Sequence, residues 1–199
     1  MLSDSQIDRY SRQIVLSEIG GEGQERLLRA EVVIQGGSDA ALVCASYLAG
    51  AGVGTLSLGV IEPRHGLGNA VDLETRNPDC RLVREARQPW LTIVLGRDVP
   101  DALWSTAAVV WGAASGDFVR MAYLPAGHAC APCLREVAGR QPADEASPQM
   151  LGALLAMEAL RVLLGLSRNE LSILVEIDVA RGECRAAPFP SRPDCLRCR

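Results

Sequence analysis

Two pairs of cysteines constrain the fold of this 199-residue chain more than any other feature. Each pair encloses two residues, with Cys130 and Cys133 in the middle of the chain and Cys195 and Cys198 at its end. Four thiolates in two such steps are the ligand set of a closed tetrahedral zinc site. The sequence therefore predicts a structural zinc ion that ties the chain end to its middle and contributes of the order of 10 kcal/mol of apparent metal-binding free energy.

The alternative for these cysteines is two redox-active or simply buried pairs. The chain has seven cysteines, and in a reducing compartment this odd number favours metal ligation over a disulfide framework. The charged, proline-containing surroundings of both pairs also favour zinc over a redox centre. Cys44, Cys80 and Cys184 stand alone, and we interpret them as ordinary buried or half-buried thiols.

The composition is typical of one soluble globular domain, with 48% hydrophobic residues and a formal net charge of -4. Basic residues are scattered and aromatic residues make up 4% of the chain, so we expect no nucleic-acid partner. The first residues are polar and acidic, unlike a signal peptide. The longest apolar run, residues 150–166, contains Glu158 and Arg161 and is too short for a membrane span. We therefore expect a cytoplasmic protein without a membrane partner.

The hydrophobic pattern predicts an α/β fold. A strand over residues 31–35, a Gly-Gly turn, a helix over 38–50 and a strand over 55–60 form a right-handed β-α-β unit. Further strands are expected over residues 80–85, 91–95, 107–111 and 118–124, with short helices over 4–12, 23–29 and 101–105. Together they predict a mostly parallel sheet with flanking helices.

The second half of the chain predicts an antiparallel extension. Residues 135–146 form a polar loop in this interpretation, and Ser147-Pro148 begins a helix that Gly165 ends. Residues 171–178 and 183–187 then form a terminal hairpin. Earlier in the chain, residues 62–77 have little periodicity, so we interpret them as a shortened crossover.

Four segments in chain order resemble the landmarks of one superfamily. They are RYSRQIVLSEIGGEGQERLLRAEVVI at residues 9–34, YLAGAGVGTLSL at 47–58, GALLAMEALRVLLG at 152–165 and RPDCLRCR at 192–199. The chain resembles the ThiF/MoeB/HesA superfamily, the bacterial relatives of ubiquitin-activating enzymes, which adenylate the C-terminal glycine of a ubiquitin-like carrier protein. The resemblance implies one Rossmann-like ThiF-type domain over residues 1–199. Residues 1–29 would be a helical dimerisation segment and residues 130–199 a zinc-clipped C-terminal part.

The glycine-rich turn with which the family binds phosphate is degenerate in this chain. The pattern G-x-G-x-x-G lets backbone amides and a helix N-terminus approach phosphate groups. The aligned residues are Gly36, Gly37, Ser38, Asp39, Ala40 and Ala41. Asp39 puts a carboxylate where a triphosphate would lie. Repulsion between this carboxylate and a phosphate charge ~4 Å away costs about 4 kcal/mol at an effective dielectric near 20. We interpret Asp39 as a helix cap that has replaced a substrate.

Other positions of the family's ATP site are also altered. Val60 replaces the acidic residue that binds the ribose, and of the magnesium-binding segment only Asp98 is left. Residues 62–72 replace a loop that binds phosphate in the family. Arg64 in this segment could reach into the site, but we interpret it as a solvated charge on a loop. Residues 135–149 contain no cysteine nucleophile. ATP and magnesium are therefore not expected as cofactors.

One functional residue of the family persists. Arg12 matches an arginine that, in the dimeric enzymes, extends into the neighbouring subunit's nucleotide site and neutralises phosphate charge. The alternative for Arg12 is an intramolecular salt bridge.

These features predict a catalytically degenerate member of the superfamily that dimerises with itself or with an intact paralogue. It would act as a structural or activating partner in the activation of a ubiquitin-like carrier protein. One alternative is a divergent ATP-dependent adenylyltransferase with a pocket rebuilt from Gly36, Gly37, Arg64 and Asp98. The other is a module that binds the carrier without nucleotide.

Overall fold

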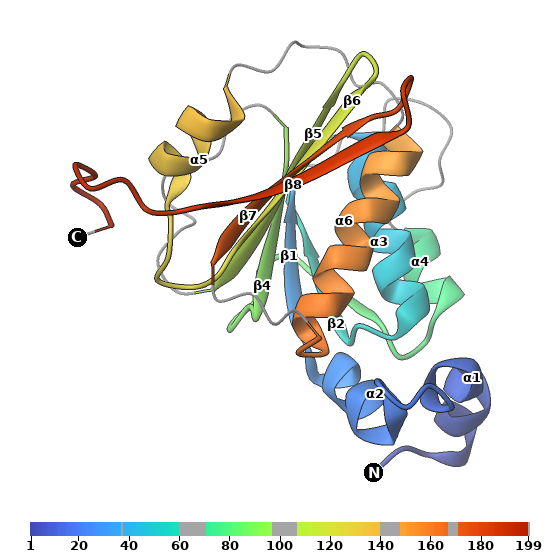
Figure 1. Ribbon diagram of the computed structural model, residues 1–199. Helices are drawn as coiled ribbons and strands as arrows, with labels where there is room; N and C mark the ends of the chain where they lie inside the picture. Colours follow the sequence, from blue (N-terminus) through green and yellow to red (C-terminus); the bar gives the residue numbers. More distant parts are fainter. Residues whose placement is uncertain (37, 60–70, 97–106, 140–147, 167–170, 199) are drawn as a thin grey trace.

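The computed structural model describes residues 1–36, 38–59, 71–96, 107–139, 148–166 and 171–198 (Figure 1). The helices are α1 (Asp4–Ile14), α2 (Gly20–Arg29), α3 (Asp39–Ala51), α4 (Val71–Arg76), α5 (Ala131–Ala138) and α6 (Pro148–Leu163). The strands are β1 (Glu31–Gln35), β2 (Thr55–Leu58), β3 (Arg81–Val83), β4 (Leu91–Leu95), β5 (Ala108–Ser115), β6 (Phe118–Leu124), β7 (Ser172–Asp178) and β8 (Glu183–Phe189).

The strands form one sheet in the order β3-β2-β1-β4-β5-β6-β7-β8. The first five strands of this order are parallel, and β6, β7 and β8 continue the sheet antiparallel. The predicted fold class is therefore confirmed. The strand order reverses between β1 and β4, and in open α/β sheets ligands bind beyond the carboxyl ends of the strands at such a reversal.

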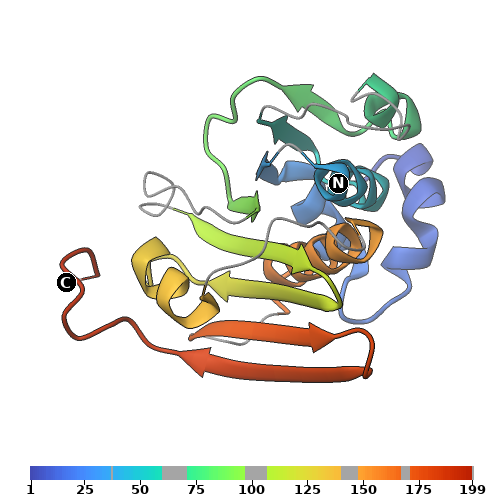
Figure 2. The same cartoon turned by 90° about the horizontal axis from the view of Figure 1, so that it is seen from above.

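Helices cover both faces of the sheet (Figure 1). α3 and α6 pack on one face and α5 lies on the other, while α1 and α2 lie beyond one end of the sheet. The larger apolar core lies between the sheet and α3 and α6, and a smaller core lies under α5. In Figure 2 the C-terminal segment runs out past the sheet on the side of α5. The end of the chain thus lies on the face that carries the first cysteine pair.

Three strands have the bounds predicted from the sequence, namely β1, β4 and β6. Each is a mainly apolar run, and a charged residue, a glycine or a proline lies at or near its ends. The local sequence therefore indicates where each strand begins and ends. α3 also agrees closely with the prediction. It ends at Gly52, whose left-handed backbone (φ 91°) suits glycine.

Several elements differ from the prediction. α4 is a short helix at the end of the segment expected to be a crossover without a full helix, and the expected helix over residues 101–105 lies outside the described residues. α2 begins at Gly20, where a break was expected, and β5 continues to Ser115 because β6 pairs with it along its length. Residues 135–138, predicted as loop, are the end of α5. A proline in the first turn suits this helix, and Leu134 and Ala138 are buried against the sheet. Packing of the buried side chains of α5 against the sheet therefore stabilises a helix in a segment that was expected to be a loop.

α6 and α3 cross at very short range at Gly152. A Cβ atom there would lie 2.5 Å from the carbonyl oxygen of Ala40 and 2.7 Å from Cβ of Val43. Glycine lets the two helices approach and fixes the start of α3 over the sheet.

Although α6 lies in the longest apolar run, no helix in the described part of the chain has both the length and the hydropathy to cross a membrane.

Candidate functional site

The four paired cysteines lie together between the start of α5 and the end of the chain. The sulfur atom of Cys130 lies 3.4 Å from that of Cys195 and 3.7 Å from that of Cys133, and Cys133 lies 3.7 Å from Cys198. All four sulfur atoms are within 4.8 Å of one another. A tetrahedral zinc ion with Zn–S bonds of about 2.3 Å needs S–S separations of about 3.8 Å. The cluster therefore fits zinc.

Backbone amides surround these sulfur atoms. The N–H of Arg192 donates to Sγ of Cys133 at 3.3 Å. The backbone N–H of Arg197 is the main cause that lowers the pKa of the Cys195 thiol to about 6. Burial raises the pKa of Cys130, and the backbone N–H of Cys133 acts in the opposite direction. Donors aimed at sulfur stabilise the thiolate form, which is the form that binds metal. At Cys198, burial and the neighbouring cysteines raise the pKa instead.

An ion-pair network holds the C-terminal cysteine pair against α5. Arg192 contacts Glu136 on α5 at 2.6 Å and Asp194 at 2.7 Å. In the cluster, Cys130 is the N-cap residue of α5 and Cys133 lies in its first turn. Zinc bound here would cross-link these two segments, and four protein ligands leave no open position for catalysis.

The glycine-containing turn identified in the sequence begins at the carboxyl end of β1. Gly36 has φ of 138°, and a Cβ atom there would lie 2.7 Å from the carbonyl oxygen of Leu95. The close approach of β4 therefore requires this glycine whether or not phosphate binds. Gly37, Val60, Arg64 and Asp98 lie outside the described residues.

Asp39 is the first residue of α3, and Ser38 is the N-cap. The interpretation of Asp39 as the cap is therefore wrong in detail, because the cap position is occupied by serine. Neither side chain caps the helix: Oγ of Ser38 and Oδ1 of Asp39 are buried without a hydrogen-bond partner among the described residues. The Asp39 carboxylate is instead placed in the first turn, where the helix dipole favours negative charge.

Arg12 is exposed on α1 and forms no ion pair with any residue that the structure describes. The alternative of an intramolecular salt bridge is thus not observed in this part of the chain.

A partly buried hydrogen-bond network fixes α1, and this network was not predicted from the sequence. Asp79 accepts hydrogen bonds from Gln6 (3.0 Å), Tyr10 (2.9 Å) and Arg9 (2.5 Å). Asn77 donates to the Tyr10 hydroxyl at 2.9 Å and to the carbonyl of Ala49 in α3 at 2.6 Å. Burial is the main reason that the pKa of Tyr10 is raised to about 12. The segment Asn-Pro-Asp is typical of an ordinary turn, so the sequence gives no local signal of this anchor.

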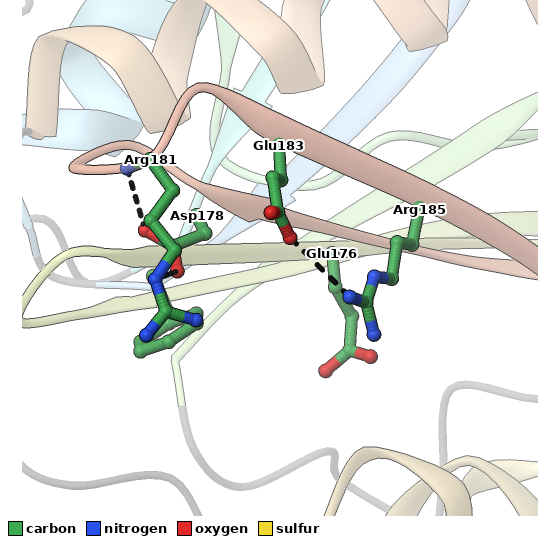
Figure 3. Close-up of a pocket in the computed structure, with 6 residues that line it drawn as sticks. Glu176, Asp178, Arg181, Glu183 and Arg185 are labelled. Atoms are coloured by element: carbon green, nitrogen blue, oxygen red, sulfur yellow. Dashed lines mark hydrogen bonds and ion pairs between the residues drawn. The ribbon is translucent and has the colours of Figure 1, made fainter.

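A small hollow of about 130 Å³ lies on the β7–β8 hairpin (Figure 3). Its labelled side chains project from one face of the hairpin. Arg185 pairs with Glu183 and Arg181 with Asp178, while Glu176 pairs with Arg120 at 2.6 Å. Because these charges are paired with one another, the described residues of the hollow offer no free cation to an anionic ligand.

Two curated relatives align with almost the whole chain. The sulfur carrier protein adenylyltransferase of Thermus thermophilus is 30% identical over 248 positions, which cover 97% of this chain and 91% of the relative. The adenylyltransferase and sulfurtransferase MOCS3 of Mus musculus is 30% identical over 246 positions, which cover 99% of this chain and 54% of the relative. Both alignments exceed the 199 residues of the chain, so both relatives contain segments that this chain lacks.

A shorter stretch is more similar. MOCS3 of Aedes aegypti is 47% identical over 57 residues, which cover 29% of this chain and 13% of that protein. Most of the length of that relative therefore has no counterpart in the match. No model of a known protein family matches the chain.

Solved structures share the fold. Escherichia coli MccB with ATP has a TM-score of 0.69 at 17% identity, covering 95% of this chain and 74% of MccB. PaaA has a TM-score of 0.69 at 16% identity, covering 94% of this chain and 84% of PaaA. At these identities the likeness establishes the arrangement of helices and strands.

Proposed function

Because the chain belongs to the ThiF/MoeB/HesA superfamily, as a shortened member, we propose that it is a catalytically degenerate partner in carrier-protein activation. In this proposal it forms a dimer, with itself or with an intact paralogue, and supports adenylation of a ubiquitin-like or sulfur-carrier protein at the partner's site. The Thermus relative is named as a sulfur carrier protein adenylyltransferase, which indicates the class of carrier.

The position of Asp39 carries the proposal. Its carboxylate lies in the first turn of α3, at the carboxyl end of β1 and beside the reversal of strand order. A nucleotide bound at this reversal would bring its phosphates to the same helix end. At ~4 Å and an effective dielectric near 20, each unit of negative charge would be repelled by about 4 kcal/mol. This argues against tight binding of ATP by the chain itself.

Arg12 supports a role toward a partner. The network around Asp79 holds α1 against the body of the protein, while Arg12 on the same helix is exposed and unpaired within the described residues. An anchored helix with a free guanidinium can present its cation to a neighbouring subunit at a small entropic cost. Residues 1–29 would accordingly be the dimerisation segment of a single domain, and zinc at the four cysteines would be structural.

The test is the adenylation rate of an intact paralogue mixed with this chain. We expect Arg12→Ala to lower that rate roughly 100-fold, the effect typical of removing one preorganised group that stabilises transition-state charge. Arg181→Ala, which removes an exposed arginine from the β7–β8 turn, should leave the rate unchanged. An unchanged rate with Arg12→Ala, in a complex shown to persist, contradicts the trans-acting role.

A divergent adenylyltransferase is the second candidate, and one observation favours it. Oγ of Ser38 and Oδ1 of Asp39 are buried and unpaired among the described residues, and buried polar atoms normally have partners. A ligand with hydrogen-bond donors would satisfy both. Carrier pull-down with and without ATP separates this candidate from a nucleotide-independent carrier-binding module, because only the former needs ATP.

A further inference from the structure

The segment that follows β8 has little apolar contact to hold it in place. Residues 190–198, all of which the structure describes, form neither helix nor strand, and Cys195 is the one buried residue among them. In Figure 2 this segment leaves the sheet on the side of α5. Ordering a segment costs conformational entropy for every residue that it fixes. Polar contacts or a bound metal must therefore supply most of what gives this segment one position.

The side chain of Arg192 joins this segment to α5. Its Nη1 atom lies 2.6 Å from a carboxylate oxygen of Glu136 on α5. Its Nε and Nη2 atoms donate to the two carboxylate oxygens of Asp194, at 3.1 Å and 2.7 Å. A planar guanidinium in such a bidentate pair is fixed in direction as well as in distance. We call these three residues the Arg192 clamp.

The backbone of Arg192 contacts both cysteine pairs. Its N–H donates to Sγ of Cys133 at 3.3 Å, and its carbonyl oxygen accepts from the N–H of Cys195 at 3.1 Å. The clamp side chains give no hydrogen bond to sulfur among the contacts described here. The guanidinium therefore acts on the cluster through the backbone that it holds in place.

The clamp is exposed, which limits what it contributes to overall stability. The side chains of Arg192, Glu136 and Asp194 are 37%, 60% and 72% exposed, and exposed ion pairs stabilise a fold only weakly. Holding one short segment requires much less than folding the sheet. A metal site whose ligands are already in position binds more tightly than one that is ordered during binding. We therefore expect the effect of the clamp on metal affinity and not on the core.

We propose that Arg192 is a positioning residue for the metal site. Through Glu136 and Asp194 it holds the Cys195–Cys198 pair beside the first cysteine pair before zinc binds, so that the four sulfur atoms are preorganised. The inference rests on the zinc assignment within the proposed function, and it requires neither the dimer nor the loss of ATP binding.

The zinc affinity of the reduced full-length chain tests the clamp, by competition with a chromophoric chelator. Arg192→Ala should weaken zinc binding at least about tenfold. Arg192→Lys keeps the charge but not the planar fork, so it should stay at least about threefold weaker than the native chain. Arg185→Ala is the matched control, because Arg185 is also paired with an acid two residues away but lies outside the cluster.

A second variant tests the contact with α5. Glu136→Gln replaces an exposed carboxylate with an amide of similar size, and it should weaken zinc binding severalfold. The double variant with Arg192→Ala should bind zinc no more weakly than Arg192→Ala alone, because both changes remove the same contact. If Arg192→Ala does not fold, Glu136→Gln carries the test.

Alkylation of the metal-free chain tests whether the clamp acts before zinc binds. Iodoacetamide reaches the buried Cys195 only when the segment opens, and mass spectrometry reads the rate at each cysteine. We expect Cys195 to react at least about fivefold faster in Arg192→Ala than in the native chain. Cys44, buried in α3, should react at the same slow rate in both chains, which shows that the fold is intact.

Any one of three results would overturn this inference: native zinc affinity in both Arg192→Ala and Glu136→Gln, full recovery in Arg192→Lys, or unchanged alkylation of Cys195. Each of them leaves the proposed function standing. A native chain that binds no zinc contradicts the zinc assignment of the proposed function and this inference together.

Discussion

At the residue scale, Asp79 shows how one carboxylate can connect distant parts of the chain. It accepts hydrogen bonds from three side chains of α1, about 70 residues earlier in the sequence. Burial alone would raise the pKa of Asp79, but the bonds from Gln6, Tyr10 and Arg9 outweigh burial and lower it. The ionised form is therefore stabilised in the folded protein, and α1 is held in one position.

Replacing Asp79 should detach α1. We expect Asp79→Ala to lower the free energy of unfolding by about 2 to 3 kcal/mol near pH 7, because three donors lose a charged acceptor. Asp8→Ala, which removes an exposed carboxylate from the same helix, should change it by less than about 0.5 kcal/mol.

The pH dependence follows from the direction of the Asp79 shift. Its folded pKa is lowered, so its stabilisation is present above the unfolded pKa of about 4 and is lost as the pH falls through the folded pKa. Urea titrations of the native chain and Asp79→Ala should therefore converge in strongly acidic solution. A difference that stays constant from pH 7 to pH 2 would contradict the assigned role of the carboxylate.

At the element scale, the contact between α3 and α6 decides how the start of α3 is held. A Cβ atom on Gly152 would overlap backbone of α3, whereas Gly50 in α3 has no described atom near the position of its Cβ. A side chain would therefore clash at Gly152 but not at Gly50. Gly152 is required by packing, and Gly50 carries the conformational entropy cost of glycine without a steric need.

The two matched substitutions should have opposite signs. We expect Gly152→Ala to destabilise the protein by about 1 to 3 kcal/mol, because the helices must separate. Gly50→Ala should stabilise it by about 0.5 to 1 kcal/mol. Thermal unfolding by circular dichroism measures both, and a neutral Gly152→Ala would show that the helices cross less closely than the structure indicates.

Elements with locally marked ends could be predicted from the sequence, and those that depend on packing could not. The apolar runs of β1 and β4 determined their bounds, whereas α5 depends on Leu134 and Ala138 packing on the sheet. For the site, cysteine spacing was sufficient to predict which sulfur atoms come together. The anchor of α1 was missed because Tyr10 and Asp79 are far apart in sequence and leave no periodic pattern.

At the scale of the whole molecule, the chain end is attached to the sheet mainly through the cysteine cluster. The segment after β8 has no further strand or helix among the described residues, and Cys195 and Cys198 bring it to α5. Zinc at this cluster would therefore couple the C-terminal segment to the rest of the fold.

Removing one ligand should release this segment. We expect one zinc per chain by atomic emission from reduced protein, and Cys195→Ser should abolish it and cost more than about 4 kcal/mol of stability. Cys184, expected from the sequence to be at least half-buried, is exposed, and Cys184→Ser outside the cluster should retain the metal. Freshly prepared protein without stoichiometric zinc would contradict the metal assignment.

The loss of ATP binding is the central claim about the whole molecule, and calorimetry of the isolated chain with Mg-ATP tests it most directly. With Asp39 at the start of α3, we expect no binding heat at ATP concentrations up to about 1 mM. Saturable binding with a dissociation constant of roughly a few micromolar would contradict the account and favour the divergent adenylyltransferase instead.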